Sequence, residues 1–79
     1  MKKSLDYFLE LPYKMSVVPD LEDGGYIAEY SELPGCITCA DTMDEVIKLA
    51  EDAKKSWIKV AYDNGDEIPL PEAMYKYSG

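Results

Sequence analysis

The stretch YIAEYSELPGCITCADTMDE, residues 26–45, predicts most of the fold, because it holds two strand patterns, a tight turn and a helix start in direct succession. Residues 26–30 alternate between two faces, the period of two that is typical of a β-strand. One face carries Tyr26, Ala28 and Tyr30, and the other carries Ile27 and Glu29. Pro34 followed by Gly35 fits a type II turn, so residues 36–40 are predicted to form a strand antiparallel to the first.

The same stretch ends in a helix start. Thr42 and Glu45 have the spacing of a capping box, in which the threonine caps the helix and the glutamate reaches back. An apolar stripe follows at intervals of three and four residues, with Trp57 at its centre. The stripe consists of Met43, Val46, Ala50, Ala53, Trp57 and Val60, and it is widened by Ile47, Leu49 and Ala61. Asp63-Asn64-Gly65 is predicted to terminate the helix through a left-handed residue.

The flanking segments carry weaker signals. Ser4 is placed to cap a short helix over residues 5–11, and residues 13–17 alternate as a strand does. The glycines of Asp23-Gly24-Gly25 supply the positive φ that a hairpin turn needs after this strand. After the long helix, Pro69 and Pro71 restrict the extended residues 66–71 to the edge of a sheet or to an arm.

These elements predict a single α+β domain over residues 1–79, with its core in residues 13–72. We expect a three-stranded antiparallel sheet with one long helix packed on it, a short N-terminal helix and a short C-terminal edge strand. The long helix covers one face of the sheet. The other face must be covered by the N-terminal helix, by the C-terminal arm or by another molecule.

Cys36 and Cys39 have the C-x-x-C spacing of redox and zinc sites. On one strand they would point to opposite faces, about 10 Å apart along the chain, whereas a disulfide needs Cα atoms within roughly 7 Å. A zinc site needs about four ligands, and the chain has no second pair of this kind and no histidine. Both cysteines are therefore expected to be reduced and structural.

Composition excludes several classes of function. The chain has sixteen acidic residues and eight lysines, with no arginine or histidine, and its net charge is −8. Nucleic-acid binders carry clustered basic residues, so direct binding of DNA or RNA is not expected. The lack of histidine removes the commonest general base and metal ligand, so we expect no enzymatic activity, no cofactor and no metal site.

Location follows from the apolar pattern. No apolar run approaches the roughly 18 residues of a membrane span, and acidic residues and a proline interrupt the N-terminal apolar stretch. A cytoplasmic protein is therefore expected.

The acidic residues are concentrated between Lys14 and Lys48, a segment without a basic residue. One interpretation is a solvated, solubilising face. The other is a surface that steers a basic protein partner into place. Seven tyrosines also suggest an interface, because tyrosine is enriched there, although core tyrosines are the alternative. The candidate partner-binding residues are Glu22, Asp23, Tyr26, Tyr30 and Glu32.

Four motifs in order resemble the N-terminal domain of HicB-family antitoxins. They are Asp23-Gly24-Gly25-Tyr26, Leu33-Pro34-Gly35-Cys36, Ala40-Asp41-Thr42 with its helix, and Ile68-Pro69-Leu70-Pro71. The resemblance covers roughly residues 13–72, and Cys39 is not part of the family pattern.

The resemblance implies a partial RNase H-like fold without nuclease activity, in a type II toxin–antitoxin system. The chain would bind and neutralise a small basic HicA-type toxin, an mRNA-cleaving ribonuclease, by occluding it, and the candidate residues above would make that contact. Many family members carry a further DNA-binding domain, which is expected to be absent here because it would begin near residues 77–79. The alternative is a stand-alone oligomerising domain with a regulatory or small-molecule-binding role and no toxin. A homo-oligomer is expected in either case.

Overall fold

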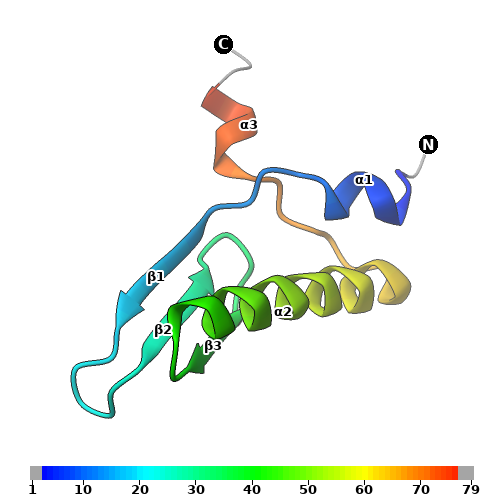
Figure 1. Cartoon of the computed structure of the whole chain (residues 1–79). Helices are drawn as coiled ribbons and strands as arrows, with labels where there is room; N and C mark the ends of the chain where they lie inside the picture. Colours follow the sequence, from blue (N-terminus) through cyan, green and yellow to red (C-terminus); the bar gives the residue numbers. More distant parts are fainter. Residues whose placement is uncertain (1–2, 77–79) are drawn as a thin grey trace.

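The computed structural model describes residues 3–76 of the chain, and Figure 1 shows a three-stranded sheet with one long helix lying across it. The expected domain end at residues 77–79 lies outside this part. The elements in chain order are α1 (Leu5–Leu9), β1 (Met15–Pro19), β2 (Tyr26–Tyr30), β3 (Ile37–Ala40), α2 (Met43–Asn64) and α3 (Glu72–Lys76). The sheet has the order β1-β2-β3 with antiparallel neighbours, which confirms the predicted α+β fold.

The β1–β2 hairpin forms where the sequence predicts it. Val18 pairs with Ile27, and the backbone N–H of Asp20 donates to the carbonyl of Gly25. Gly24 and Gly25 have φ values of 80° and 78°, which only glycine adopts at little cost. The Asp20 carboxylate accepts hydrogen bonds from the backbone N–H groups of the next loop residues, Glu22 and Asp23, so the hairpin tip has an ordered backbone.

The β2–β3 connection is a tight turn whose leucine enters the core. The backbone N–H of Cys36 donates to the carbonyl of Leu33, and Gly35 between them has a φ of 80°, as a type II turn requires. The Leu33 side chain is only 1% exposed. This turn therefore belongs to the hydrophobic core although its backbone lies at the edge of the domain.

Helix α2 has the predicted ends. The Thr42 hydroxyl accepts a hydrogen bond of 3.2 Å from the backbone N–H of Glu45, and Gly65 closes the helix with a φ of 74°. The backbone N–H of Gly65 donates to the carbonyl oxygens of Ala61 and Tyr62.

The predicted apolar stripe of α2 is partly wrong. Its fully buried members include Val46 and also Ile58, which the stripe omitted. Trp57 is only half-buried and lies beside the core rather than at its centre. Three predicted members remain exposed, namely Met43, Leu49 and Val60. Successive helical residues turn by about 100°, so the long stripe is wider than the single sheet face that can cover it.

The core lies between α2 and one face of the sheet. Ala28 and Tyr30 enter it from β2, as their shared strand face predicts. Helix α1 packs against α2, where the rings of Phe8 and Tyr62 meet edge to face, with 6.1 Å between the ring centroids. The N-terminal helix therefore lies beside the long helix, and Val18 on the other sheet face stays 52% exposed.

The predicted C-terminal edge strand is absent from the described residues. Residues 66–71 form neither helix nor strand, and they are followed by α3, a helix that the sequence analysis did not predict. Pro69 and Pro71 lack the N–H that a strand ladder needs. Other contacts hold the segment: Ile68 and Pro71 are buried, and the Tyr13 hydroxyl donates a hydrogen bond of 2.6 Å to the carbonyl of Pro69.

Candidate partner-binding surfaces

The structure separates the five predicted partner-binding residues into two groups at opposite ends of β2. Glu22 and Asp23 are exposed at the hairpin tip, and Tyr26 is half-buried at the start of the strand beside them. Tyr30 and Glu32 lie at the other end, where β2 leads into the turn before β3. The residues therefore do not form one continuous patch.

Tyr30 is a core side chain with little surface for a partner. It is 5% exposed, and the Lys54 ammonium lies 5.5 Å from its ring centroid. Burial, and secondarily the charge of Glu51 and the Cys36 thiol, raises the pKa of this phenol. The ring therefore stays neutral and acts as a packing surface under α2.

Glu32 ties three parts of the chain together. One carboxylate oxygen accepts a hydrogen bond of 2.7 Å from the backbone N–H of Lys14, and the other accepts one from the backbone N–H of Glu72. These contacts join the turn after β2 to the segment before β1 and to the start of α3. The carboxylate is thus engaged within the fold, which the charge pattern of the sequence did not indicate.

Acidic residues from two distant segments gather at one end of the molecule. Tyr26 pairs with Ala40, so the start of β2 lies beside the end of β3 and the first turn of α2 (Figure 1). The hairpin contributes three carboxylates and the start of α2 contributes three more. This acidic end consists of Asp20, Glu22, Asp23, Asp41, Asp44 and Glu45. The sequence showed the charges, but only the strand register brings the two segments together.

The sheet face turned away from α2 is partly apolar and uncovered. Val18, Ile27 and Cys39 follow one another across the three strands in register, and Ile37 lies nearby on β3. Cys39 is exposed and Ile37 is 57% exposed. Cys36, by contrast, is buried, so the two free thiols lie in different environments, as the strand alternation predicts.

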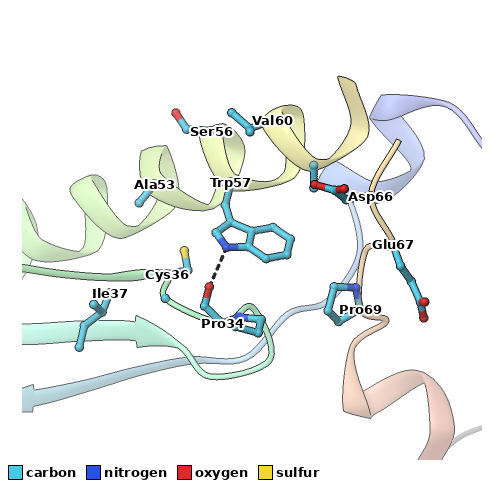
Figure 2. Close-up of a pocket in the computed structure, with 12 residues that line it drawn as sticks. Pro34, Cys36, Ile37, Ala53, Ser56, Trp57, Val60, Asp66, Glu67 and Pro69 are labelled. Atoms are coloured by element: carbon cyan, nitrogen blue, oxygen red, sulfur yellow. Dashed lines mark hydrogen bonds between the residues drawn. The ribbon is translucent and has the colours of Figure 1, made fainter. Parts of the chain in front are cut away.

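A groove opens between the second half of α2 and the turn before β3, with a volume of about 730 Å³ (Figure 2). Trp57 crosses it, and its indole N–H donates a hydrogen bond of 2.8 Å to the carbonyl of Pro34. The buried Cys36 thiol also lines the groove, and burial raises its pKa, so it contributes an apolar surface. Acidic side chains occur at one end only, where Asp66 and Glu67 lie.

Two structural features of the described residues concern metal ions and membranes. Within residues 3–76, no group of three or more His, Cys, Asp or Glu side chains is arranged to hold a metal ion. None of the helices in this same range combines the length and the apolar character needed to cross a membrane.

Comparison with known proteins identifies the family. Residues 13–78 match the family model described as HicB_like antitoxin of bacterial toxin-antitoxin system. Antitoxin HicB 1 of Photorhabdus laumondii subsp. laumondii is 30% identical over 59 residues, which are 75% of this chain and 37% of that protein. The UPF0150 protein ssl0259 of Synechocystis sp. is 30% identical over 61 residues, which are 77% of this chain and 82% of that protein.

The match to the antitoxin covers only part of that relative, since the chain spans little more than a third of its length. The match to the family model covers most of this chain, from two residues before β1 through α3. The chain therefore belongs to the HicB-like antitoxin family of bacterial toxin–antitoxin systems.

Proposed function

We propose that this chain is a cytoplasmic antitoxin that binds a small basic HicA-type toxin, an mRNA-cleaving ribonuclease, and neutralises it by occlusion. Membership of the HicB-like antitoxin family supports a toxin partner. The chain has no histidine, and the proposed role is to cover the toxin rather than to catalyse a reaction. The same charge balance, −8 with no arginine, disfavours nucleic acid as the partner of these residues.

The acidic end carries this proposal. Six carboxylates from the hairpin tip and the start of α2 share one end of the molecule, and the sequence has no lysine between positions 14 and 48. A one-sign surface of this kind attracts a basic partner over about a Debye length, 8–10 Å at physiological salt, and mainly increases the association rate. Glu22 and Asp23 are both exposed in the turn at the hairpin tip.

The neighbouring side chains supply apolar contact area. Tyr26 is half-buried at the start of β2, next to the hairpin tip, and its cross-strand partner Pro19 on β1 is exposed. Such amphipathic and apolar side chains suit the centre of an interface, with the carboxylates at its rim. Tyr30 and Glu32 lie at the other end of β2 with side chains engaged within the fold, so the proposed contact surface does not include them.

Charge reversal at the hairpin tip tests the proposal. Glu22→Lys with Asp23→Lys should slow association with a basic HicA-type toxin by at least tenfold at low salt, and should flatten the salt dependence. Both side chains are exposed, and only their backbone N–H groups bond to Asp20, so the fold should persist.

The matched control is Glu10→Lys with Glu51→Lys, which makes the same charge change at exposed positions outside the acidic end. Stopped-flow or biosensor kinetics at two ionic strengths give the comparison. Equal association rates for both double variants would reduce the acidic end to a solubilising surface. No association of the wild-type chain with the toxin would overturn the proposed function itself.

A further inference from the structure

Helix α2 carries a row of apolar and small side chains that the core leaves largely exposed. The row consists of Leu49, Ala53, Ser56 and Val60, spaced by four, three and four residues, and it is called the outer row here. Such spacing places the side chains along one face of a helix. Leu49 is 41% exposed and Val60 is 59% exposed. Neighbouring exposed apolar side chains are typical of a surface that a partner covers.

The groove continues this row towards the turn before β3. Ala53, Ser56 and Val60 line the groove from α2, and Ile37, which is 57% exposed, lines it from the edge strand β3 (Figure 2). No lysine is among the described residues that line the groove, and its carboxylates lie at one end. The outer row and the groove therefore form one apolar surface with an acidic end.

A partner can cover the Trp57 ring that crosses the groove at little cost. The indole N–H already donates to the carbonyl of Pro34, so covering the ring leaves no polar atom of this side chain unpaired. Gly35 fixes the adjacent turn with its φ of 80°, and the rings of Pro34 and Pro69 restrict the backbone at two further points of the lining. A groove that is already ordered loses little conformational entropy when it binds, and tryptophan is enriched among the residues that dominate binding energy.

The charged side chains at the groove indicate the chemistry of its occupant. Asp66 and Glu67 are both exposed and directly follow Gly65, which ends α2. Among the described residues, neither carboxylate has a hydrogen-bond or ion-pair partner, whereas Asp63 is paired with Lys59. A segment with apolar side chains for the groove and a lysine or arginine for its acidic end would match both parts of the surface.

The outer row also connects the groove with the acidic end of the molecule. Glu45, a member of that acidic end, precedes Leu49 by four residues, so it lies on the same face of α2. The fifteen residues from Glu45 to Val60 span about 22 Å at 1.5 Å per residue. A standard interface buries about 800 Å² on each partner, which is a patch roughly 30 Å across. One partner of ordinary size therefore reaches both regions along this face.

We propose that the groove seats an amphipathic segment of the toxin, with apolar side chains against Trp57 and a lysine or arginine at Asp66 and Glu67. This inference rests on the proposed function, because a basic toxin is its premise. The two contact regions then have different roles. The acidic end attracts the toxin over a distance and raises the association rate, whereas the groove holds the docked complex and lowers the dissociation rate.

Dissociation kinetics of a basic HicA-type toxin test this difference. Val60→Glu should raise the dissociation rate about tenfold, because it places a charge in the apolar contact. An added carboxylate does not slow the approach of a basic toxin, so the association rate should not fall. Asp66→Asn with Glu67→Gln should raise the dissociation rate about threefold at the acidic end of the groove. Glu22→Lys with Asp23→Lys should show the opposite pattern, with its main effect on association.

Val18→Glu is the matched control. It makes the same substitution as Val60→Glu at a residue of similar exposure, 52% against 59%, on the sheet face turned away from α2. Both rates should stay at their wild-type values. Circular dichroism spectra and denaturation midpoints of all variants confirm that the fold is kept.

The single tryptophan of the chain gives an independent readout. A chain labelled with fluorotryptophan has one fluorine resonance, from Trp57, and saturation with unlabelled toxin should shift it. An unshifted resonance, or a Val60→Glu chain that releases the toxin as slowly as wild type, would overturn the groove contact and leave the proposed function standing. No binding of the toxin by the wild-type chain would overturn the proposed function and this inference with it. A resonance that shifts with the concentration of the chain alone would assign the groove to a second copy and overturn the inference.

Discussion

The indole Nε1 of Trp57 donates a hydrogen bond of 2.8 Å to the carbonyl oxygen of Pro34. The contact joins the second half of α2 to the turn between β2 and β3, 23 residues earlier in the chain. This hydrogen bond holds the orientation of the half-buried Trp57 ring. One part of the ring packs against the core, and the indole N–H donates to the carbonyl of the turn.

Trp57→Phe should lower the free energy of unfolding by about 1 kcal/mol, because it keeps most of the ring area and removes one hydrogen bond. Urea denaturation followed by circular dichroism at one fixed protein concentration measures this change. An unchanged midpoint would mean that water replaces the indole at Pro34 without loss.

Ile58→Ala should be far more damaging than its place outside the predicted stripe suggests. The side chain is fully buried, and truncation of a buried isoleucine costs about 2–5 kcal/mol, a large share of the stability of a small domain. Thermal denaturation should show a strongly lowered midpoint or an unfolded chain. Leu21→Ala, a truncation at an exposed residue, should stay within about 0.5 kcal/mol of wild type.

The two adjacent glycines of the hairpin should respond differently to alanine. Both have positive φ, so each substitution costs about 1–2 kcal/mol of backbone strain. A Cβ on Gly24 meets open space, whereas a Cβ on Gly25 would lie 2.5 Å from the carbonyl oxygen of Ala40. Gly25→Ala should therefore have the lower denaturation midpoint of the pair. Equal midpoints would show that β2 and β3 separate there without cost.

Alkaline pH should destabilise the fold through Tyr13. Burial, with smaller contributions from the charges of Glu32 and Tyr7, raises the pKa of this phenol to about 12 from an ordinary value of 10.0. The folded pKa is the higher one, so the stability linked to this group is complete below pH 10 and is lost as the pH rises towards 12. Its hydroxyl donates to the carbonyl of Pro69, which only the protonated form can do.

Urea denaturation between pH 9 and pH 11.5 measures this dependence. Tyr13→Phe should be less stable than wild type near pH 9 by about 1 kcal/mol, the value of one hydrogen bond, and should show a flatter decline at higher pH. Parallel curves for the two chains would exclude Tyr13 as the titrating group.

The two thiols should react at different rates. Cys39 is exposed, whereas Cys36 is buried with a raised pKa, and the thiolate is the reactive form. A disulfide reagent at pH 8 should label one thiol quickly and the second only slowly, and unfolding in denaturant should make both fast. Cys39→Ser should remove the fast phase. Two equal rates in the folded chain would contradict the difference in burial.

Local chemistry was sufficient to predict the elements that depend on near neighbours. Thr42 caps α2, Gly65 ends it, and Gly24, Gly25 and Gly35 form the turns, because capping and positive φ are settled within a few residues. The alternation of residues 26–30 placed Ala28 and Tyr30 on the same strand face, since a strand has only two faces, and contact with α2 buries that face. The four family motifs rest on the same local features.

The net charge and the lack of histidine are likewise properties of the sequence alone, and they restrict the chemistry of any site. The RNase H-like kinship stays a prediction from the resemblance.

The tertiary structure decided which side of a broad helix stripe is buried and how the acidic segments are arranged. Ile58 and Val60 are equally apolar by sequence. Successive helical residues lie about 100° apart around the axis, so the two side chains point in different directions, and contact with the sheet buries Ile58 and leaves Val60 exposed. Local sequence patterns likewise did not determine the conformation of residues 66–71. Tyr13 contacts Pro69 in that segment and Glu32 contacts Glu72 directly after it, across 40 residues or more of chain. Contacts at such separations depend on packing rather than on any local pattern.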